Sequence, residues 1–177
     1  MSLFKKKIYV VVAVIAFILL ALLATALSVW FFGGSEVEVL VYEDFEYKIL
    51  ENEKLEIVAY RGTGGDVKIP SAIKGRSVYS IGDGAFREKN VVSVSFGAFL
   101  AEIGSYAFAD CESLDTVTFD SDVTKIGDFA FFGTAISGIN LPDSVSYVGR
   151  GAFADCRILK SFKAPQSLTE IPDSMLS

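Results

Sequence analysis

The chain has 177 residues, no histidine and a formal net charge of −6 at pH 7. This length accommodates about one domain and a short appendage, and the acidic balance argues against nucleic acid as a partner. The lack of histidine removes the commonest general base, metal ligand and near-neutral pH switch in proteins. We therefore expect no enzyme activity, no cofactor and no metal site.

A long apolar segment lies near the N-terminus. Residues 1–7 end in three lysines, and residues 8–32 follow without a charge. A helix of this length reaches about 37 Å, enough to cross a hydrocarbon core of roughly 30 Å. Because lysines precede the segment and acidic residues follow it, the positive-inside tendency predicts a single-pass signal anchor, with residues 1–7 as a cytoplasmic basic tail and the remainder outside the cell membrane. The alternative is secretion after cleavage near Ala26, because Ala24-Thr25-Ala26 fits a signal peptidase site.

Two segments separate the anchor from the remainder of the chain. Residues 33–44 are short and acidic and are predicted to be a linker. Residues 45–66 are predicted to form a cap, because residues 45–50 and 55–60 show the alternation of an antiparallel β-hairpin. The glycine-rich residues 61–66 lack the Gly-Lys-Ser/Thr ending of a phosphate loop, so we interpret them as a tight turn.

A six-residue phrase of the form Ile-Gly-x-x-Ala-Phe occurs four times between residues 81 and 153. Its copies are residues 81–86, 103–108, 126–131 and 148–153, with valine in place of isoleucine in the last copy. The steps of 22, 23 and 22 residues are typical of a solenoid built from similar coils. We assign residues 67–177 to this solenoid. We expect its last repeat to be incomplete. In residues 171–176, which align with the phrase, proline and methionine replace glycine and alanine.

Each coil also contains an apolar pattern of the form L-x-x-L-x-L, of which Leu114, Val117 and Phe119 are one copy. Because side chains alternate along a strand, the pattern predicts one short parallel strand per coil, with the x positions pointing outward. The recurring phrase is expected to return the chain as a short helical or irregular turn. Its glycine either removes a side chain or permits a left-handed backbone, and its phenylalanine fills the core.

The repeats resemble BspA-type leucine-rich repeats. The resemblance rests on residues 126–131 and 148–153, on the unit Cys111-x-x-Leu114-x-x-Val117-x-Phe119, and on Leu141-Pro142-Asp143-Ser144-Val145. It extends over residues 45–177. Members of that family are typically exported or surface-attached bacterial proteins, with assigned roles mostly in adhesion to host proteins or other cells. The resemblance implies a binding protein, and it transfers no catalytic residues.

The sequence thus predicts a mainly β fold: a leucine-rich repeat solenoid with coils of about 22–23 residues, an N-terminal hairpin cap and one preceding transmembrane helix. The expected function is binding of a protein or glycan at the cell surface, with adhesion as the role. Two alternatives remain: a structural spacer or assembly module without its own ligand, and a fragment of a larger exported protein whose functional module lies elsewhere.

The two cysteines, Cys111 and Cys156, occupy equivalent positions two coils apart. With strands stacked about 4.8 Å apart, this spacing places them roughly 10 Å from each other, beyond the ~7 Å limit for the Cα atoms of a disulfide. We expect free thiols that pack as small apolar residues.

Asp83 and Asp128 are acidic residues at equivalent turn positions, where the other coils have Ser105 and Arg150. A position that accepts all three residue types is interpreted as a turn exposed to solvent rather than an acid/base or calcium site.

The outward positions of the predicted strands are the candidate ligand-binding residues, because a solenoid offers an extended surface there. The candidates are Lys68, Ser95, Thr118, Asn140 and Lys163. A second outward row is formed by Ser93, Thr116, Gly138 and Ser161. Phe108, Phe131 and Phe153 recur in register and are assigned to the core rather than to a pocket.

Overall fold

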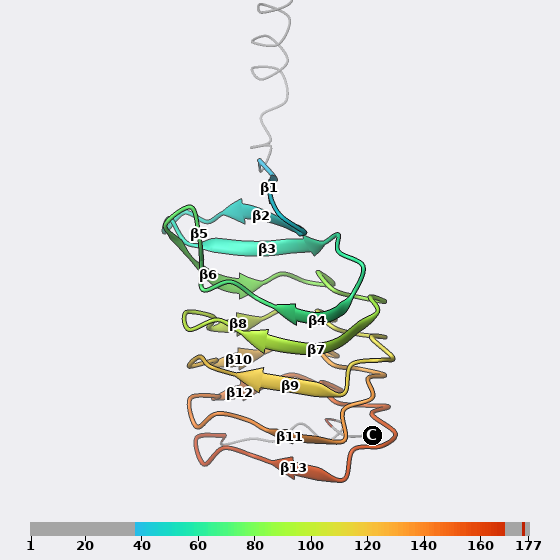
Figure 1. The fold of residues 1–177 in the computed structure, drawn as a ribbon. Coiled ribbons are helices and arrows are strands. Elements are labelled where there is room, and N and C mark those ends of the chain that lie inside the picture. Colours follow the sequence, from blue (N-terminus) through green and yellow to red (C-terminus); the bar gives the residue numbers. More distant parts are fainter. Residues whose placement is uncertain (1–37, 169–174, 176–177) are drawn as a thin grey trace, which may run out of the picture. The chain divides into compact units, whose positions relative to one another are not determined.

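Short strands stacked in successive coils build the protein, as the ribbon shows (Figure 1). The computed structural model describes residues 38–168 and 175. The segment predicted to be a membrane anchor, residues 8–32, lies outside the described residues. Among the residues that are described, none belongs to a helix with the length and hydropathy needed to cross a membrane.

The cap is an antiparallel sheet of three strands. Strands β2 (Phe45–Ile49) and β3 (Leu55–Tyr60) pair antiparallel, which confirms the predicted hairpin. A further strand, β1 (Leu40–Tyr42), pairs antiparallel with β2. The sequence places these three residues in the linker, but they are good strand formers and Glu43 turns the chain with a positive φ of 52°. The cap therefore begins before residue 45.

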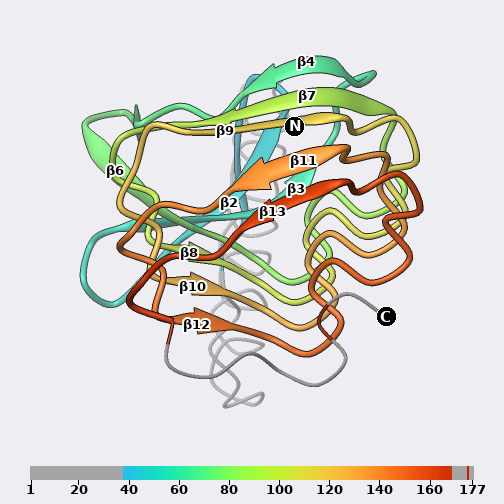
Figure 2. The ribbon, with the colours of Figure 1, turned by 90° about the horizontal axis from the view of Figure 1, so that it is seen from below.

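One wall of the solenoid is formed by the predicted parallel strands. The strands of this wall are β4 (Gly65–Lys68), β7 (Val91–Phe96), β9 (Thr116–Phe119), β11 (Gly138–Asn140) and β13 (Ser161–Lys163). β4, β7 and β9 form one parallel sheet, and β11 and β13 form another. In the view along the stack, these strands lie on one side of the coil and a second set lies on the other (Figure 2).

The second wall is a parallel sheet that was not expected from the sequence. Its strands are β6 (Arg76–Ile81), β8 (Glu102–Ile103), β10 (Lys125–Ile126) and β12 (Tyr147–Val148), and β6 also pairs antiparallel with β5 (Ala72–Ile73). β3 pairs parallel with β6, so this wall continues directly from the cap. The strands end at the isoleucine or valine of the recurring phrase, and three of them are only two residues long, too short for a visible alternating pattern.

The phrase continues as a run of turns rather than as a helix, which corrects the expectation of short helical turns. Alternate backbone N–H groups donate to the next coil: Tyr106 to the carbonyl of Asp128 at 2.9 Å, and Phe108 to that of Ala130 at 2.7 Å. The intervening Ala109 N–H instead closes a turn on the Tyr106 carbonyl at 3.1 Å. Tyr106 and Asp110 have positive φ values of 56° and 60°. A helix cannot form, because its donors are used between coils and left-handed residues interrupt it.

The glycine of the phrase is required for close approach between coils. A Cβ atom on Gly127 would lie 2.6 Å from the backbone nitrogen of Ser105 and 2.7 Å from the carbonyl carbon of Gly104. Gly104 meets the backbone of Asp83 in the same way. None of the phrase glycines at this first position is among the residues with positive φ. Of the two roles considered for this glycine, removal of a side chain is therefore the correct one.

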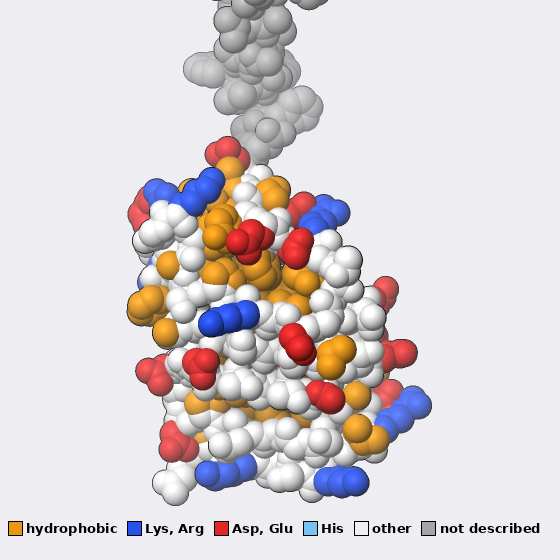
Figure 3. Space-filling model, in the orientation of Figure 1, with side chains coloured by type: hydrophobic (Ala, Val, Ile, Leu, Met, Phe, Trp, Pro, Cys, Tyr) orange, Lys and Arg blue, Asp and Glu red, His pale blue; other side chains and the backbone are white. Residues whose placement is uncertain are grey.

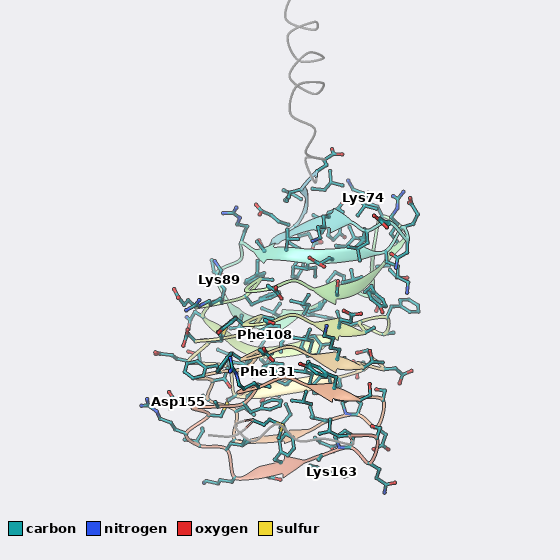
Figure 4. The ribbon with its side chains drawn as sticks, turned by 180° about the vertical axis from the view of Figure 1, so that it is seen from behind. Lys74, Lys89, Phe108, Phe131, Asp155 and Lys163 are labelled. Atoms are coloured by element: carbon teal, nitrogen blue, oxygen red, sulfur yellow. The ribbon has the colours of Figure 1, made fainter. Side chains whose placement is uncertain are left out.

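The core is a column of phenylalanine rings between the two walls. Phe108 and Phe131 stack with ring centroids 5.3 Å apart and an interplanar angle of 3°, and Phe131 stacks on Phe153 at 5.4 Å and 2°. Phe86 extends the column above Phe108 at 4.8 Å. Figure 4 shows Phe108 and Phe131 one above the other inside the coils. This confirms the assignment of the phrase phenylalanines to the core.

Cys111 and Cys156 are free thiols and both are buried, as predicted. The Cys111 Sγ donates to the Phe86 carbonyl at 3.0 Å, and the Cys156 Sγ to the Phe131 carbonyl at 3.2 Å. Burial raises the pKa of the Cys111 thiol to about 11 and raises that of Cys156 as well. These thiols therefore remain protonated and pack as small core residues.

Candidate functional site

The five predicted ligand-binding residues lie on the outer surface of the first wall, which we call the strand face. Lys68 is aligned with Ser95 in the β4–β7 register, and Ser95 with Thr118 in the β7–β9 register. Asn140 is aligned with Lys163 in the β11–β13 register. The structure thus places the candidates in two aligned segments of one face. All five are at least partly exposed.

A second row of polar residues runs beside the first. Asp66, Ser93 and Thr116 are aligned across β4, β7 and β9, and Gly138 is aligned with Ser161. The Ser93 hydroxyl donates to Asp66 Oδ1 at 2.6 Å, which fixes the upper end of this row. The strand face is consequently rich in small hydroxyl groups, with lysines at its two ends.

The parallel ladder of this face is interrupted between β9 and β11, which belong to different sheets. Val117 and Phe119, the inward residues of β9, are only partly buried, whereas Val94 and Phe96 of β7 are each 1% exposed. Gly138 stands at the break and has no side chain to pack across it. A band of hydrophobic side chains crosses the surface between β9 and β11 (Figure 3). This apolar opening could not be predicted from the sequence, because the apolar spacing of β9 is the same as that of its neighbours.

A cavity that could not be predicted from the sequence lies on the second wall. It has a volume of about 510 Å³ and follows the corners where the strands meet the phrase glycines. We call it the glycine-corner groove. Its lining includes Lys48, Glu56, Ser80, Asp83, Glu102, Ser105 and Lys125, together with Gly82, Gly104 and Gly127.

Register explains how these side chains meet. Lys48 is aligned with Glu56, Glu56 with Ser80, Ser80 with Glu102, and Glu102 with Lys125. They form one aligned row across β2, β3, β6, β8 and β10, in which Ser80 is buried. In the sequence, a polar residue stands directly before the isoleucine of the first three phrases. This residue indicates a shared row only when the phrase is known to begin in a strand.

Hydrogen bonds and ion pairs hold several groups of the groove in place. Lys48 Nζ lies 2.6 Å from Glu56 Oε1, and the Ser80 hydroxyl donates to Glu56 Oε2 at 3.3 Å. The Tyr79 hydroxyl donates to Glu102 Oε1 at 3.2 Å. Desolvation, followed by the charge of Glu102, raises the pKa of Tyr79. This tyrosine therefore acts as a donor throughout the physiological range.

The turn aspartates link the coils. Asp83 Oδ1 accepts a hydrogen bond from the Ser105 backbone N–H at 2.7 Å, and Asp128 Oδ1 accepts one from the Arg150 N–H at 2.9 Å. Each carboxylate thus satisfies a backbone donor one coil further along the chain. Within residues 38–168 and 175, there is no group of three or more acidic or cysteine side chains arranged to hold a metal ion.

Stacked parallel strands, a column of core phenylalanines and inter-coil turn bonds define a repeat solenoid of the leucine-rich type. The family model that matches the chain describes a BspA-type leucine-rich repeat region, with six copies over residues 76–177. The chain belongs to this family. No curated protein matches it.

Three solved structures are similar to the chain. A leucine-rich repeat protein of T. pallidum is 27% identical, with a TM-score of 0.73, and the alignment covers 78% of this chain and 66% of that protein. A leucine-rich repeat protein from Bacteroides capillosus is 24% identical, with a TM-score of 0.64, over 71% of this chain and 96% of that one. The pneumococcal vaccine antigen PcpA is 22% identical, with a TM-score of 0.62, over 74% of this chain and 39% of PcpA. The last two likenesses show the fold alone, and the chain spans less than two thirds of the T. pallidum protein and of PcpA.

Proposed function

We propose that this protein is a non-catalytic binding module that attaches to a protein or glycan ligand at the bacterial cell surface, and that the strand face is where its main ligand lies. Membership of a family of bacterial surface repeats supports the class of function. The chemistry of the strand face supports the proposal that the main ligand binds there. Adhesion is the role that such a surface serves.

The observation that carries the proposal is the arrangement around β9. Val117 and Phe119 are partly buried apolar side chains. The exposed Thr116 and Thr118 alternate with them along β9, and the exposed Asn140 lies on β11. An apolar centre within a polar rim is the usual anatomy of a protein-binding surface. This arrangement favours a protein ligand over a glycan at this face.

Direct binding measurements test the proposal. The full-length chain in detergent micelles is passed over immobilised fibronectin, laminin and fibrinogen, with serum albumin as the control surface. Saturable binding to a matrix protein and none to albumin is the expected result. No binding to any of the three would favour the alternative of a structural spacer without its own ligand.

We also propose that residues 8–32 retain the protein in the cell membrane, with the repeats outside. The support is the uncharged segment between Lys7 and Gly33 and the net charge of −9 on everything beyond it. N-terminal sequencing of the mature protein distinguishes the two fates. An intact N-terminus in the membrane fraction is expected, and a mature protein that begins at Leu27 would establish secretion instead.

A further inference from the structure

The glycine-corner groove belongs to the second wall. The strands of that wall lie on the other side of the coil from the strand face (Figure 2), so a ligand in the groove would leave the strand face free. Its volume of about 510 Å³ falls within the range of roughly 300–1,000 Å³ typical of ligand sites. Its lining extends from β2 to β10 across β3, β6 and β8. With neighbouring strands about 4.8 Å apart, these four steps give a length of about 19 Å along the solenoid. The groove is therefore suited to a chain-like ligand.

The floor of the groove is backbone rather than side chain. Gly82, Gly104 and Gly127 line it from successive coils, and the close coil approach excludes any larger residue at Gly104 and Gly127. The side chains of Ile81 and Ile103 are 1% exposed and belong to the core. A ligand can thus approach peptide groups closely, without meeting a broad apolar surface.

The walls carry both signs of charge. Glu56, Asp83 and Glu102 are acidic, and Lys48 and Lys125 are basic. A strongly cationic ligand would meet the two lysines at the ends of the row, and a strongly anionic one would meet the three carboxylates between them. Complementarity favours a ligand without net charge that both donates and accepts hydrogen bonds.

We propose that the glycine-corner groove is a second binding site that takes a neutral glycan chain laid along the solenoid axis. The carboxylates of Asp83 and Glu102 accept from sugar hydroxyls, and the Lys125 ammonium and the Ser105 hydroxyl donate to hydroxyl and ring oxygens. Asp83 and Glu102 are each held by one hydrogen bond, from Ser105 N–H and from Tyr79 respectively. These groups are therefore positioned before the ligand arrives, which lowers the entropic cost of binding.

Titration with defined oligosaccharides tests this site. The full-length chain, in micelles of a detergent without a sugar headgroup, is titrated with cellohexaose, maltohexaose and chitohexaose, and with a heparin hexasaccharide as the charged contrast. Saturable binding of at least one neutral hexasaccharide is expected, together with weaker binding of heparin. Binding of none of the three, or tighter binding of heparin, would overturn the proposal.

Variants assign the binding to the groove. Ser105→Tyr fills the groove while its backbone N–H can still donate to Asp83, and Glu102→Gln removes a charged acceptor without changing its size. We expect Ser105→Tyr to weaken glycan binding at least tenfold and Glu102→Gln to weaken it at least fivefold. Thr118→Arg on the strand face is the matched control and should leave glycan affinity unchanged.

Wild-type affinity in both groove variants would contradict the assignment. If Ser105→Tyr lowers the melting temperature, Glu102→Gln alone decides. Failure of this site leaves the strand-face proposal intact, because the two sites share no residue.

Discussion

Phe131 illustrates how much a single repeated residue contributes to the solenoid. It is completely buried and stacks on Phe108 above and Phe153 below. We expect Phe131→Ala to lower the free energy of unfolding by about 3–5 kcal/mol, because it removes a large side chain and leaves a cavity between coils. Chemical denaturation monitored by intrinsic fluorescence measures this. A loss below ~1 kcal/mol would mean that the register of the coils is wrong.

Gly127 is the residue-scale test of the close approach between coils. We expect Gly127→Ala to lower the free energy of unfolding by about 1–3 kcal/mol. The added Cβ would press on the backbone of Gly104 and Ser105, which cannot rotate away. Gly138→Ala is the matched control, since its Cβ would meet only Ser161 at an ordinary 3.6 Å. The control should be neutral or slightly stabilising. Equal melting temperatures for the two variants would contradict the account of the glycine corners.

The burial of large apolar residues that repeat in register could be predicted from the sequence. Phe108, Phe131 and Phe153 occupy one place in three coils, and only a shared core explains a large ring at each. The role of the phrase glycine could not be predicted, because a close contact and a left-handed turn both require glycine. Only the distance from the glycine to the neighbouring coil distinguishes these two roles.

The turns are the element whose structure differs most from the expectation. Helical turns are the usual return segment in repeats of this length, and the phrase has no residue that forbids a helix outright. The N–H groups of Tyr106 and Phe108 nevertheless donate to the next coil. Such bonds form only when a neighbouring coil is present, so they cannot be predicted from the sequence of a single coil. The second parallel sheet, with its two-residue strands, could not be predicted for the same reason.

Amide hydrogen exchange tests the pattern of turn bonds. The Phe108 N–H donates to the next coil at 2.7 Å, whereas the adjacent Ala109 N–H closes a turn at 3.1 Å. We expect Phe108 to exchange with the slow rate of global unfolding and Ala109 to exchange faster, since opening one turn does not separate two coils. Equal protection at both amides, extended over the whole phrase, would indicate a helical turn instead.

At the scale of the whole molecule, the solenoid presents two separate surfaces. The strand face could be predicted because its strand pattern alternates visibly, and the five candidates Lys68, Ser95, Thr118, Asn140 and Lys163 indeed lie on it. The glycine-corner groove could not, because it arises from the stacking of corners that are distant in sequence. The chemistry of the two surfaces also differs: one has an apolar centre, and the other has a polar row over exposed backbone.

Ligand attachment by strand-face variants tests the central claim most directly. The double variant Thr118→Arg/Asn140→Arg places bulk and charge beside the apolar opening, and Ser105→Tyr on the opposite wall is its control. Binding to the matrix protein that the wild type recognises is measured for all three by surface plasmon resonance, with melting temperatures in parallel. The account predicts at least tenfold weaker binding for the double variant, with melting unchanged, and wild-type binding for Ser105→Tyr. Wild-type affinity in a folded double variant would contradict the claim that the strand face binds the ligand.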